Sequence, residues 1–199
     1  MRSAVKKIIL CLAPLFLGLL GLFFERKYLR GRHFEGSVAG FYWAFKALWV
    51  RNILRLAPPL PWPAALSCHV SNPRNIIFHP DNLDNFQSPG TYWQNFNACI
   101  HLGRGSYIAP NVGLITANHE MGALDEHAQG RDIVIGERCW IGMNAVILPG
   151  VTLGSDTIVA AGAVVTKSFP EGGVVLGGIP AKIIRFCKVE TPLDGASGS

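Results

Sequence analysis

The sequence has few cysteines and no two of them at CxxC spacing. The five are Cys11, Cys68, Cys99, Cys139 and Cys187, an odd number. Disulfide frameworks use even sets and structural zinc sites use CxxC pairs, so the sequence favours neither, and we expect no metal. Cys99 and Cys139 lie inside the apolar repeat described below and are expected to be small core residues. Free thiols fit a reducing compartment.

Acidic residues are scarce in the first part of the chain. Residues 1–60 hold ten Lys/Arg and two Asp/Glu, so 10 − 2 = +8, whereas residues 61–199 hold eight and eleven, so 8 − 11 = −3. The basic residues therefore flank apolar sequence and do not cover a folded domain. A nucleic-acid-binding domain would carry them on its folded surface, so we expect no nucleic-acid partner.

No small-residue cleavage site follows the apolar run of residues 8–24; Glu25, Arg26 and Lys27 follow it instead. This disfavours a secretory signal peptide and predicts an uncleaved membrane anchor. As a helix the run would reach about 25 Å, near the lower limit for crossing a bilayer core of about 30 Å. Pro14 also allows a kinked or re-entrant helix, so a spanning and a re-entrant anchor both stay open, as does the orientation.

A second helix is expected over residues 37–56, with Ser37 as a plausible cap. The segment is unusually aromatic, and one side of it holds Arg51, Asn52 and Arg55. This composition favours a helix that lies on the bilayer surface. The alternative is a helix packed on the domain that follows.

The feature that organises the chain is an apolar residue at every sixth position from Phe96 to Pro170. Neither helical nor simple strand periodicity keeps such a register. A period of six is typical of a parallel β-helix, in which each hexapeptide supplies one short strand and one turn. The repeated positions are Phe96, Leu102, Ile108, Leu114, Ile135, Ile141, Ile147, Leu153, Val159 and Val165.

The repeat breaks once, between Leu114 and Ile135. The two are 135 − 114 = 21 positions apart where the period allows six, so 21 − 6 = 15 positions are inserted. His119 stands where the insertion begins. Before the repeat, residues 66–92 keep an imperfect rhythm with one clear strand at 76–78, as expected of the first, capping coils.

Three regions follow from these patterns. Residues 1–60 form a membrane anchor with an amphipathic helix, 61–190 form the β-helix, and 191–199 form a flexible tail. The proline-rich stretch 58–63 is predicted to be a stiff linker between the first two.

Four stretches in order make the sequence similar to a known family, the left-handed parallel β-helix (hexapeptide-repeat) acyltransferases, and within it to the galactoside, maltose and xenobiotic O-acetyltransferase branch. The segment 1–65 lies outside this resemblance and is more weakly similar to the membrane-proximal leader of acetyltransferases found with polysaccharide-assembly enzymes. The stretches are 92–97 (YWQNFN), 108–119 (IAPNVGLITANH), 139–142 (CWIG) and 162–167 (GAVVTK) with 178–182 (GIPAK).

The resemblance implies a mainly β fold, a left-handed β-helix that assembles as a homotrimer, with acetyl-CoA bound between neighbouring prisms. His119 occupies the family's catalytic position. An imidazole that titrates near neutral pH is suited to take the proton from an attacking hydroxyl. Its orienting partner stays open between Glu120, Asp125, Glu126 and a backbone carbonyl, and His127 is expected to be mainly solvated.

The resemblance also implies which residues bind the two substrates. Asn95 matches an acceptor-binding asparagine, with a turn role as its alternative, and His79 and Asp81 are weaker candidates for the acceptor. His101 is expected to be structural or on the surface. The candidates for contact with acetyl-CoA are Trp140, Ala161, Thr166, Lys167, Lys182 and Arg185, whose cations suit phosphate.

These expectations describe a membrane-associated acetyl-CoA-dependent O-acetyltransferase with its β-helix in the cytoplasm. It would act on a sugar hydroxyl, plausibly of a lipid-linked or polysaccharide intermediate. Membrane lipid and the sugar acceptor would be its partners. A small soluble acceptor is the second choice, and a non-catalytic β-helix scaffold is the third.

Overall fold

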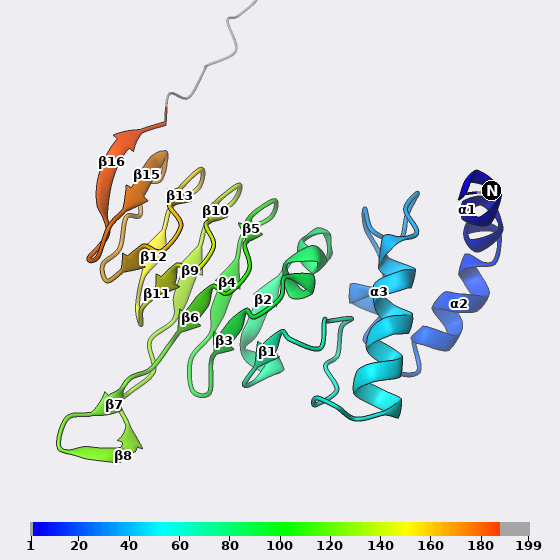
Figure 1. The fold of residues 1–199 in the computed structure, drawn as a ribbon, viewed down its shortest axis with the longest axis horizontal. Coiled ribbons are helices and arrows are strands. Elements are labelled where there is room, and N and C mark those ends of the chain that lie inside the picture. The colour runs from blue at the N-terminus through cyan, green and yellow to red at the C-terminus, as the bar shows by residue number, and fades with distance from the viewer. Residues whose placement is uncertain (1, 188–199) are drawn as a thin grey trace, which may run out of the picture.

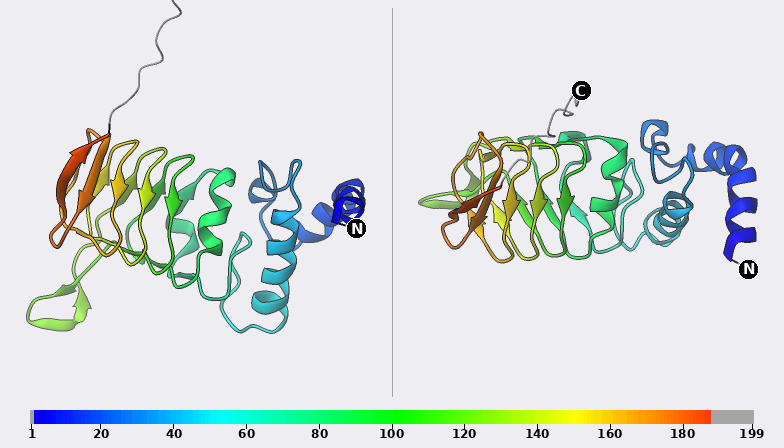
Figure 2. Two further views of the ribbon diagram at one scale, coloured as in Figure 1. Left: turned by 45° about the horizontal axis from the view of Figure 1, so that its top comes forward. Right: turned by 90° about the horizontal axis from the view of Figure 1, so that it is seen from above.

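The computed structural model describes residues 2–187 of the 199. Short parallel strands stack in successive coils, the N-terminal helices lie at one end of the stack, and one hairpin projects from its body (Figures 1 and 2). The coiled strands form three sheets, which we name face A (β1-β3-β6-β11-β14), face B (β12-β9-β4-β2) and face C (β16-β15-β13-β10-β5). The chain is therefore mainly β, with the parallel sheets expected of a β-helix.

The strands are short, as hexapeptide coils require. The helical segments are α1 Arg2–Cys11, α2 Ala13–Leu20, η1 Arg26–Tyr28, α3 Ala39–Ala47, η2 Leu48–Ile53, η3 Pro73–Asn75 and η4 Pro80–Gln87. The strands are β1 His69–Val70, β2 Ile76–Phe78, β3 Tyr92–Gln94, β4 Ile100–Leu102, β5 Tyr107–Ile108, β6 Gly113–Ile115, β7 His119–Glu120, β8 Ala123–His127, β9 Ile133–Ile135, β10 Trp140–Ile141, β11 Val146–Ile147, β12 Thr152–Leu153, β13 Ile158–Val159, β14 Val164–Val165, β15 Val174–Gly177 and β16 Lys182–Phe186.

The predicted period of six is confirmed as one strand per hexapeptide. Ile141 pairs with Val159 and Ile147 with Val165, and both pairs span three periods, so three hexapeptides make one coil. The repeated apolar residues from Leu102 to Val165 all point inward and are buried. Small residues are needed where coils touch: a Cβ on Gly136 would lie 2.5 Å from the backbone nitrogen of Ser155. The sequence period is thus the repeat distance of a packed core.

Phe96 is an exception to the predicted pattern. It keeps the spacing of six but lies outside any strand and is 42% exposed. The reason is that its coil is longer: Trp93 pairs with Leu114, at a separation of 114 − 93 = 21 positions, whereas Ile141 and Val159 are 159 − 141 = 18 positions apart. The longer coil shifts the phase, and Trp93, which is fully buried, takes the core position.

The two cysteines of the repeat differ in burial. Cys139 is buried in the core as predicted, and its burial is the main reason that the pKa of its thiol is raised. Cys99 is only partly buried. It directly precedes β4, whose Ile100 and Leu102 point inward, so Cys99 faces out on the alternating strand. The prediction of a core role for Cys99 was therefore wrong.

The apolar run 8–24 is broken. It forms the end of α1 and all of α2, which are separated at Leu12, before Pro14. Within residues 2–187, no helix combines the length and the apolarity that a membrane crossing requires. Leu20 and Phe24, at the end of the run, join the same buried core as the β-helix.

The predicted second helix is shorter than 37–56 and changes pitch. Its α-helical part is α3, and η2 continues it as a π-helix. The N-cap position of α3 is taken by Val38 and not by the predicted Ser37, whose hydroxyl accepts a hydrogen bond from the backbone N–H of Ala39 at 3.2 Å. Phe41 and Ala44 are buried, so one face of the helix packs against the rest of the protein. This agrees with the alternative prediction, a helix packed on the domain that follows. Tyr42 on the other face is exposed.

Arg51 was predicted on an exposed polar side and is instead 3% exposed. Its guanidinium donates to backbone carbonyls of the segment that leads into the first coil. The acceptors are the carbonyl oxygens of Pro58, Ala64, Ala65, Leu66 and Cys68.

The segment 58–63 also packs on the β-helix. Trp62 is fully buried, with its ring 5.0 Å from those of Phe78 and Phe86. The predicted linker is thus held against the first coils. The predicted tail, 191–199, lies outside the described residues.

Candidate functional site

The insertion is present where the sequence placed it, and it has the predicted size. Tyr107 pairs with Trp140 at a separation of 140 − 107 = 33 positions, whereas Trp140 pairs with Ile158 at 158 − 140 = 18, and 33 − 18 = 15. The inserted chain leaves the prism after β6 on face A and returns at β9 on face B. In Figure 1 it ends in the β7–β8 hairpin, which stands away from the coils.

His119 lies on this hairpin and is exposed. It pairs with His127 across the antiparallel strands, and the two rings lie 4.5 Å apart, tilted by 35°. The His127 ring in turn meets Phe96 edge-on at 5.5 Å. A row of three rings therefore links His119 to the turn after β3. His127 was expected to be mainly solvated, and its contacts on both sides are a new feature.

The root of the insertion is held by hydrogen bonds. The Gln94 side chain accepts from the backbone of Thr116 at 2.9 Å and of Ala117 at 3.0 Å, and it donates to the Ala117 carbonyl at 3.0 Å. Arg131 N donates to the Thr116 carbonyl at 2.8 Å and closes the loop. Gln94 is buried. It was not singled out from the sequence, because a glutamine in a strand carries no signal that it binds a distant backbone.

The three acidic candidates for orienting His119 lie on or beside the same hairpin. Glu120, Asp125 and Glu126 are all exposed. In the described part of the chain, none of them forms an ion pair or hydrogen bond with His119. Within a single chain these carboxylates therefore do not orient the His119 ring, and the His119 ring contacts His127 instead.

Asn95 has the turn role that the sequence left as its alternative. Its side chain is fully buried, accepts from Asn72 N at 3.0 Å and donates to the Asn72 carbonyl at 2.6 Å. Both ends of the amide are thus used by one backbone segment. This geometry does not support the predicted contact with an acceptor.

His79 and Asp81 lie at the other end of the prism, around the start of η4. His79 Nδ1 accepts from Asp81 N at 3.1 Å. Asp81 accepts from the backbone N–H of Arg32 at 3.0 Å, and this hydrogen bond, followed by that from Arg104, lowers the pKa of its carboxyl. Asp81 joins the N-terminal segment to the coils through Arg32 and Arg104, and His79 contacts Asp81. Neither residue is brought to the hairpin.

Face C gathers several of the residues expected to contact acetyl-CoA. Trp140 pairs with Ile158, Ile158 with Val175, and Val175 with Arg185, so the four stand in one row across neighbouring strands. Trp140 is 55% exposed. Lys182 opens β16, the last strand of the same face, and is also exposed. An indole with two cations beyond it could receive an extended ligand with a phosphate-bearing end.

The remaining three candidates lie at the corners of the prism. Ala161 stands at the turn from face C to face A, and Thr166 and Lys167 stand at the turn from face A to face B. All three are exposed. The insertion leaves the prism at an earlier turn of the same A-to-B corner. A single chain therefore presents the residues expected to contact acetyl-CoA on two separate regions of its surface. One is face C with its corner to face A, and the other is the corner between faces A and B.

The four main hollows on the described part of the chain lie away from His119. They are lined by residues between Ile9 and Arg104, near the N-terminal helices and first coils. The most apolar of them, about 640 Å³ in volume, lies against α3 and is lined by Phe16, Phe41 and Phe45 among others. His119 belongs to none of the four.

The sequence comparisons agree with the coils. Residues 132–167 match the family model of the bacterial transferase hexapeptide (six repeats). The chain is 37% identical to the galactoside O-acetyltransferase of Escherichia coli over 47% of this chain and 49% of that protein. It is 34% identical to a putative lipopolysaccharide biosynthesis O-acetyl transferase, WbbJ, of the same organism, over 60% of this chain and 65% of that protein.

A solved structure is similar over a comparable extent. It is a hexapeptide-repeat acetyltransferase of Vibrio cholerae in complex with acetyl-CoA, with 37% identity over 46% of this chain and 51% of that chain, at a TM-score of 0.43. The chain spans less than two thirds of the length of the curated relatives named above. Over the matched residues, this chain is related to the hexapeptide-repeat acetyltransferases.

Proposed function

We propose that the protein is an acetyl-CoA-dependent O-acetyltransferase that acts on a sugar hydroxyl, with His119 as general base. The observation that carries the proposal is the insertion: one turn of the prism is extended by 15 residues into a hairpin and holds an exposed His119. The relatedness to galactoside and lipopolysaccharide O-acetyltransferases supports both the reaction and the acceptor class.

In this mechanism the acceptor hydroxyl attacks the thioester carbonyl while His119 takes its proton. The new C–O bond forms, the C–S bond breaks, and the leaving CoA thiolate takes the proton back from His119. No acyl-enzyme is needed. Burial raises the pKa of the Cys68 and Cys139 thiols, which makes them poor nucleophiles at neutral pH.

We propose that the working site forms between copies of the chain, as a homotrimer. The hairpin with His119 projects from one region, and Trp140, Lys182 and Arg185 lie exposed on face C. A second copy docked at the hairpin would bring its own donor residues beside His119. This arrangement would enclose the exposed His119 between two chains.

The reaction is tested with the purified full chain, acetyl-CoA and a panel of free and lipid-linked sugars. We expect CoA thiol release that depends on the acceptor, together with addition of one acetyl group to the acceptor by mass spectrometry. Preference for a free sugar over every lipid-linked one would contradict the lipid-linked acceptor and indicate a small soluble acceptor. Absence of transfer to all acceptors would leave the scaffold as the function.

The row of rings predicts a positioning role for His127. His127→Ala is expected to lower kcat about tenfold, because the His119 ring loses the neighbour that restricts it. His127→Phe restores an aromatic contact on both sides and is expected to recover most of kcat. Steady-state kinetics with both variants checks this, and KM for acetyl-CoA is expected to stay unchanged. Equal losses in the two variants would contradict the stacking role.

We propose further that the protein binds the cytoplasmic surface of a membrane through its N-terminal helices. Several large apolar side chains there are exposed, and basic residues accompany them, a combination that favours anionic lipid surfaces. Leu22, for example, is 77% exposed. The others include Leu15, Leu19, Phe23, Tyr42, Trp49 and Ile53.

Point substitutions test this proposal without removing the buried parts of the N-terminal segment. The double variant Leu15→Ser/Leu22→Ser is expected to reduce cosedimentation with vesicles containing anionic phosphatidylserine severalfold, because two exposed apolar contacts with the bilayer are lost. Leu124→Ser is the control, since Leu124 is equally exposed but lies on the distant β8. Unchanged binding of the double variant would contradict the proposed surface.

A further inference from the structure

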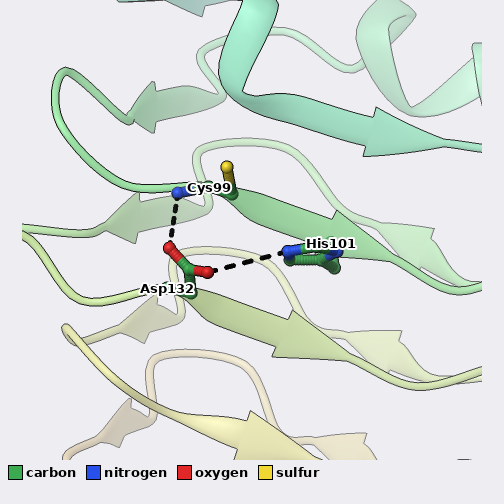
Figure 3. A group of neighbouring side chains, drawn as sticks. All are labelled: Cys99, His101 and Asp132. Carbon is green, nitrogen blue, oxygen red and sulfur yellow. Dashed lines mark hydrogen bonds and ion pairs between the residues drawn. The ribbon is translucent and has the colours of Figure 1, made fainter.

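Three side chains with metal-binding chemistry meet on the outside of face B. Ile100 of β4 pairs with Ile133 of β9, so the residues just before them, Cys99 and Asp132, lie side by side on adjacent coils. His101 follows Cys99 by two positions and faces the same way, since side chains alternate along a strand. Figure 3 shows the three together on neighbouring strands.

Their donor atoms are close enough to share one ion. The Cys99 sulfur, a His101 ring nitrogen and an Asp132 carboxylate oxygen all lie within 4.8 Å of one another. Within the set, His101 Nε2 and Asp132 Oδ2 are 3.8 Å apart. Ligands of a tetrahedral zinc ion are about 3.3–3.6 Å apart, given bonds of about 2.0–2.3 Å. Small side-chain rotations would therefore close the set around an ion.

The carboxylate is already oriented for this role. Asp132 Oδ1 accepts a hydrogen bond from Cys99 N at 2.7 Å, which leaves Oδ2 facing His101 (Figure 3). The backbones that carry the three residues are fixed by the paired strands β4 and β9. An ordinary surface ion pair between His101 and Asp132 would explain neither the thiol beside them nor the anchored carboxylate.

We propose that Cys99, His101 and Asp132 bind a divalent transition-metal ion, with zinc as the ion that fits best. A thiolate, an imidazole and a carboxylate are the ligands that zinc accepts in proteins, and a water completes the tetrahedron. Binding releases the thiol proton of Cys99 to solvent and leaves a thiolate on the metal. His101 and Asp132 are 39% and 54% exposed at their side chains, so the ion can enter from solvent.

The position of the site suggests what the ion does. Asp132 is the last residue before β9 and so ends the inserted loop that holds His119. Cys99 and His101 belong to the preceding coil. The ion would therefore fasten the returning end of the insertion to the prism, next to the hydrogen bond between Arg131 and Thr116. This is a structural role, separate from the proton transfer assigned to His119.

The test uses the full chain freed of metal with a chelator, titrated with Co²⁺ as a spectroscopic substitute for zinc. We expect absorption from sulfur-to-cobalt charge transfer that saturates at one ion per chain. Cys99→Ser is expected to abolish this band, while Cys11→Ser, which changes an exposed cysteine outside the cluster, leaves it intact. Zn²⁺ at about a hundredfold above its Kd is expected to raise Tm of the unmodified chain by about 5–10 °C.

Two results would overturn the proposal: no sulfur-dependent band in the unmodified chain, or a band that persists in Cys99→Ser. His101→Gln provides a second variant should Cys99→Ser fold poorly, and circular dichroism verifies the fold of both. Loss of the band in His101→Gln supports the site, and its persistence at unchanged strength and affinity contradicts it. Because every readout is metal binding, the outcome does not depend on acetyl transfer.

Discussion

His119→Ala is expected to lower kcat for acetyl transfer by about 10²-fold or more, the contribution typical of a positioned general base. The side chain is exposed on the β7–β8 hairpin, so its loss leaves no cavity and removes no core contact. A large fall in kcat at an unchanged Tm would therefore report chemistry and not unfolding. Steady-state kinetics and a thermal melt on the same preparation measure both.

The matched control for this variant is Asp125→Asn on the same hairpin. Asp125 is exposed and forms no ion pair with His119 in the described structure, so turnover is expected to stay within about twofold of the unmodified protein. Near-normal turnover of His119→Ala would remove His119 from the mechanism. A large loss in Asp125→Asn would instead reassign the orienting role to this carboxylate.

The repeat could be predicted from the sequence because it is a local pattern with a rigid geometric consequence. Once a hexapeptide forms one strand and one turn, coils of three hexapeptides fix which residues point inward, and an interruption must leave the prism. The size of the insertion and its placement at His119 followed directly. Phe96 shows the limit, because one longer coil changed the phase with no signal in the spacing of apolar residues.

The candidate site was less predictable because polar side chains do not encode their partners. An asparagine at position 95 has the same chemistry whether it binds a sugar hydroxyl or the backbone of Asn72, and only the fold decides. Cys99 and Asp132 lie on either side of the insertion, which conceals in the sequence that they are neighbours on adjacent coils. Contacts that cross the insertion require the three-dimensional register.

Arg51 shows the same limit with the largest consequence for stability. On a regular helix it falls beside Asn52 and Arg55, which suggested an exposed polar side. In the structure the last turns are the π-helix η2, and Arg51 points into the space between this helix and residues 58–68. Its partners are backbone carbonyls, which every residue carries, so no side-chain pattern could reveal them.

Arg51→Met is therefore expected to lower the free energy of unfolding by about 3–5 kcal/mol, the cost of leaving buried polar groups without a charged partner. Methionine fills much of the same space, but the carbonyls of Pro58, Ala65 and Cys68 each lose a charge-assisted hydrogen bond. Tm is expected to fall by about 10 °C or more. Denaturant unfolding followed by circular dichroism measures the change.

Two further substitutions separate the possible causes of that loss. Lys46→Met removes a cation from the exposed side of the same helix and is expected to change the free energy of unfolding by less than about 0.5 kcal/mol. Arg51→Lys keeps the charge, but a single ammonium cannot reach carbonyls on several sides as the guanidinium does. Its free energy of unfolding is therefore expected to fall by more than that of Lys46→Met and by less than that of Arg51→Met. If Arg51→Lys were as stable as the unmodified chain, charge alone would suffice. An Arg51→Met variant of unchanged stability would mean that Arg51 does not hold the N-terminal helices to the first coil.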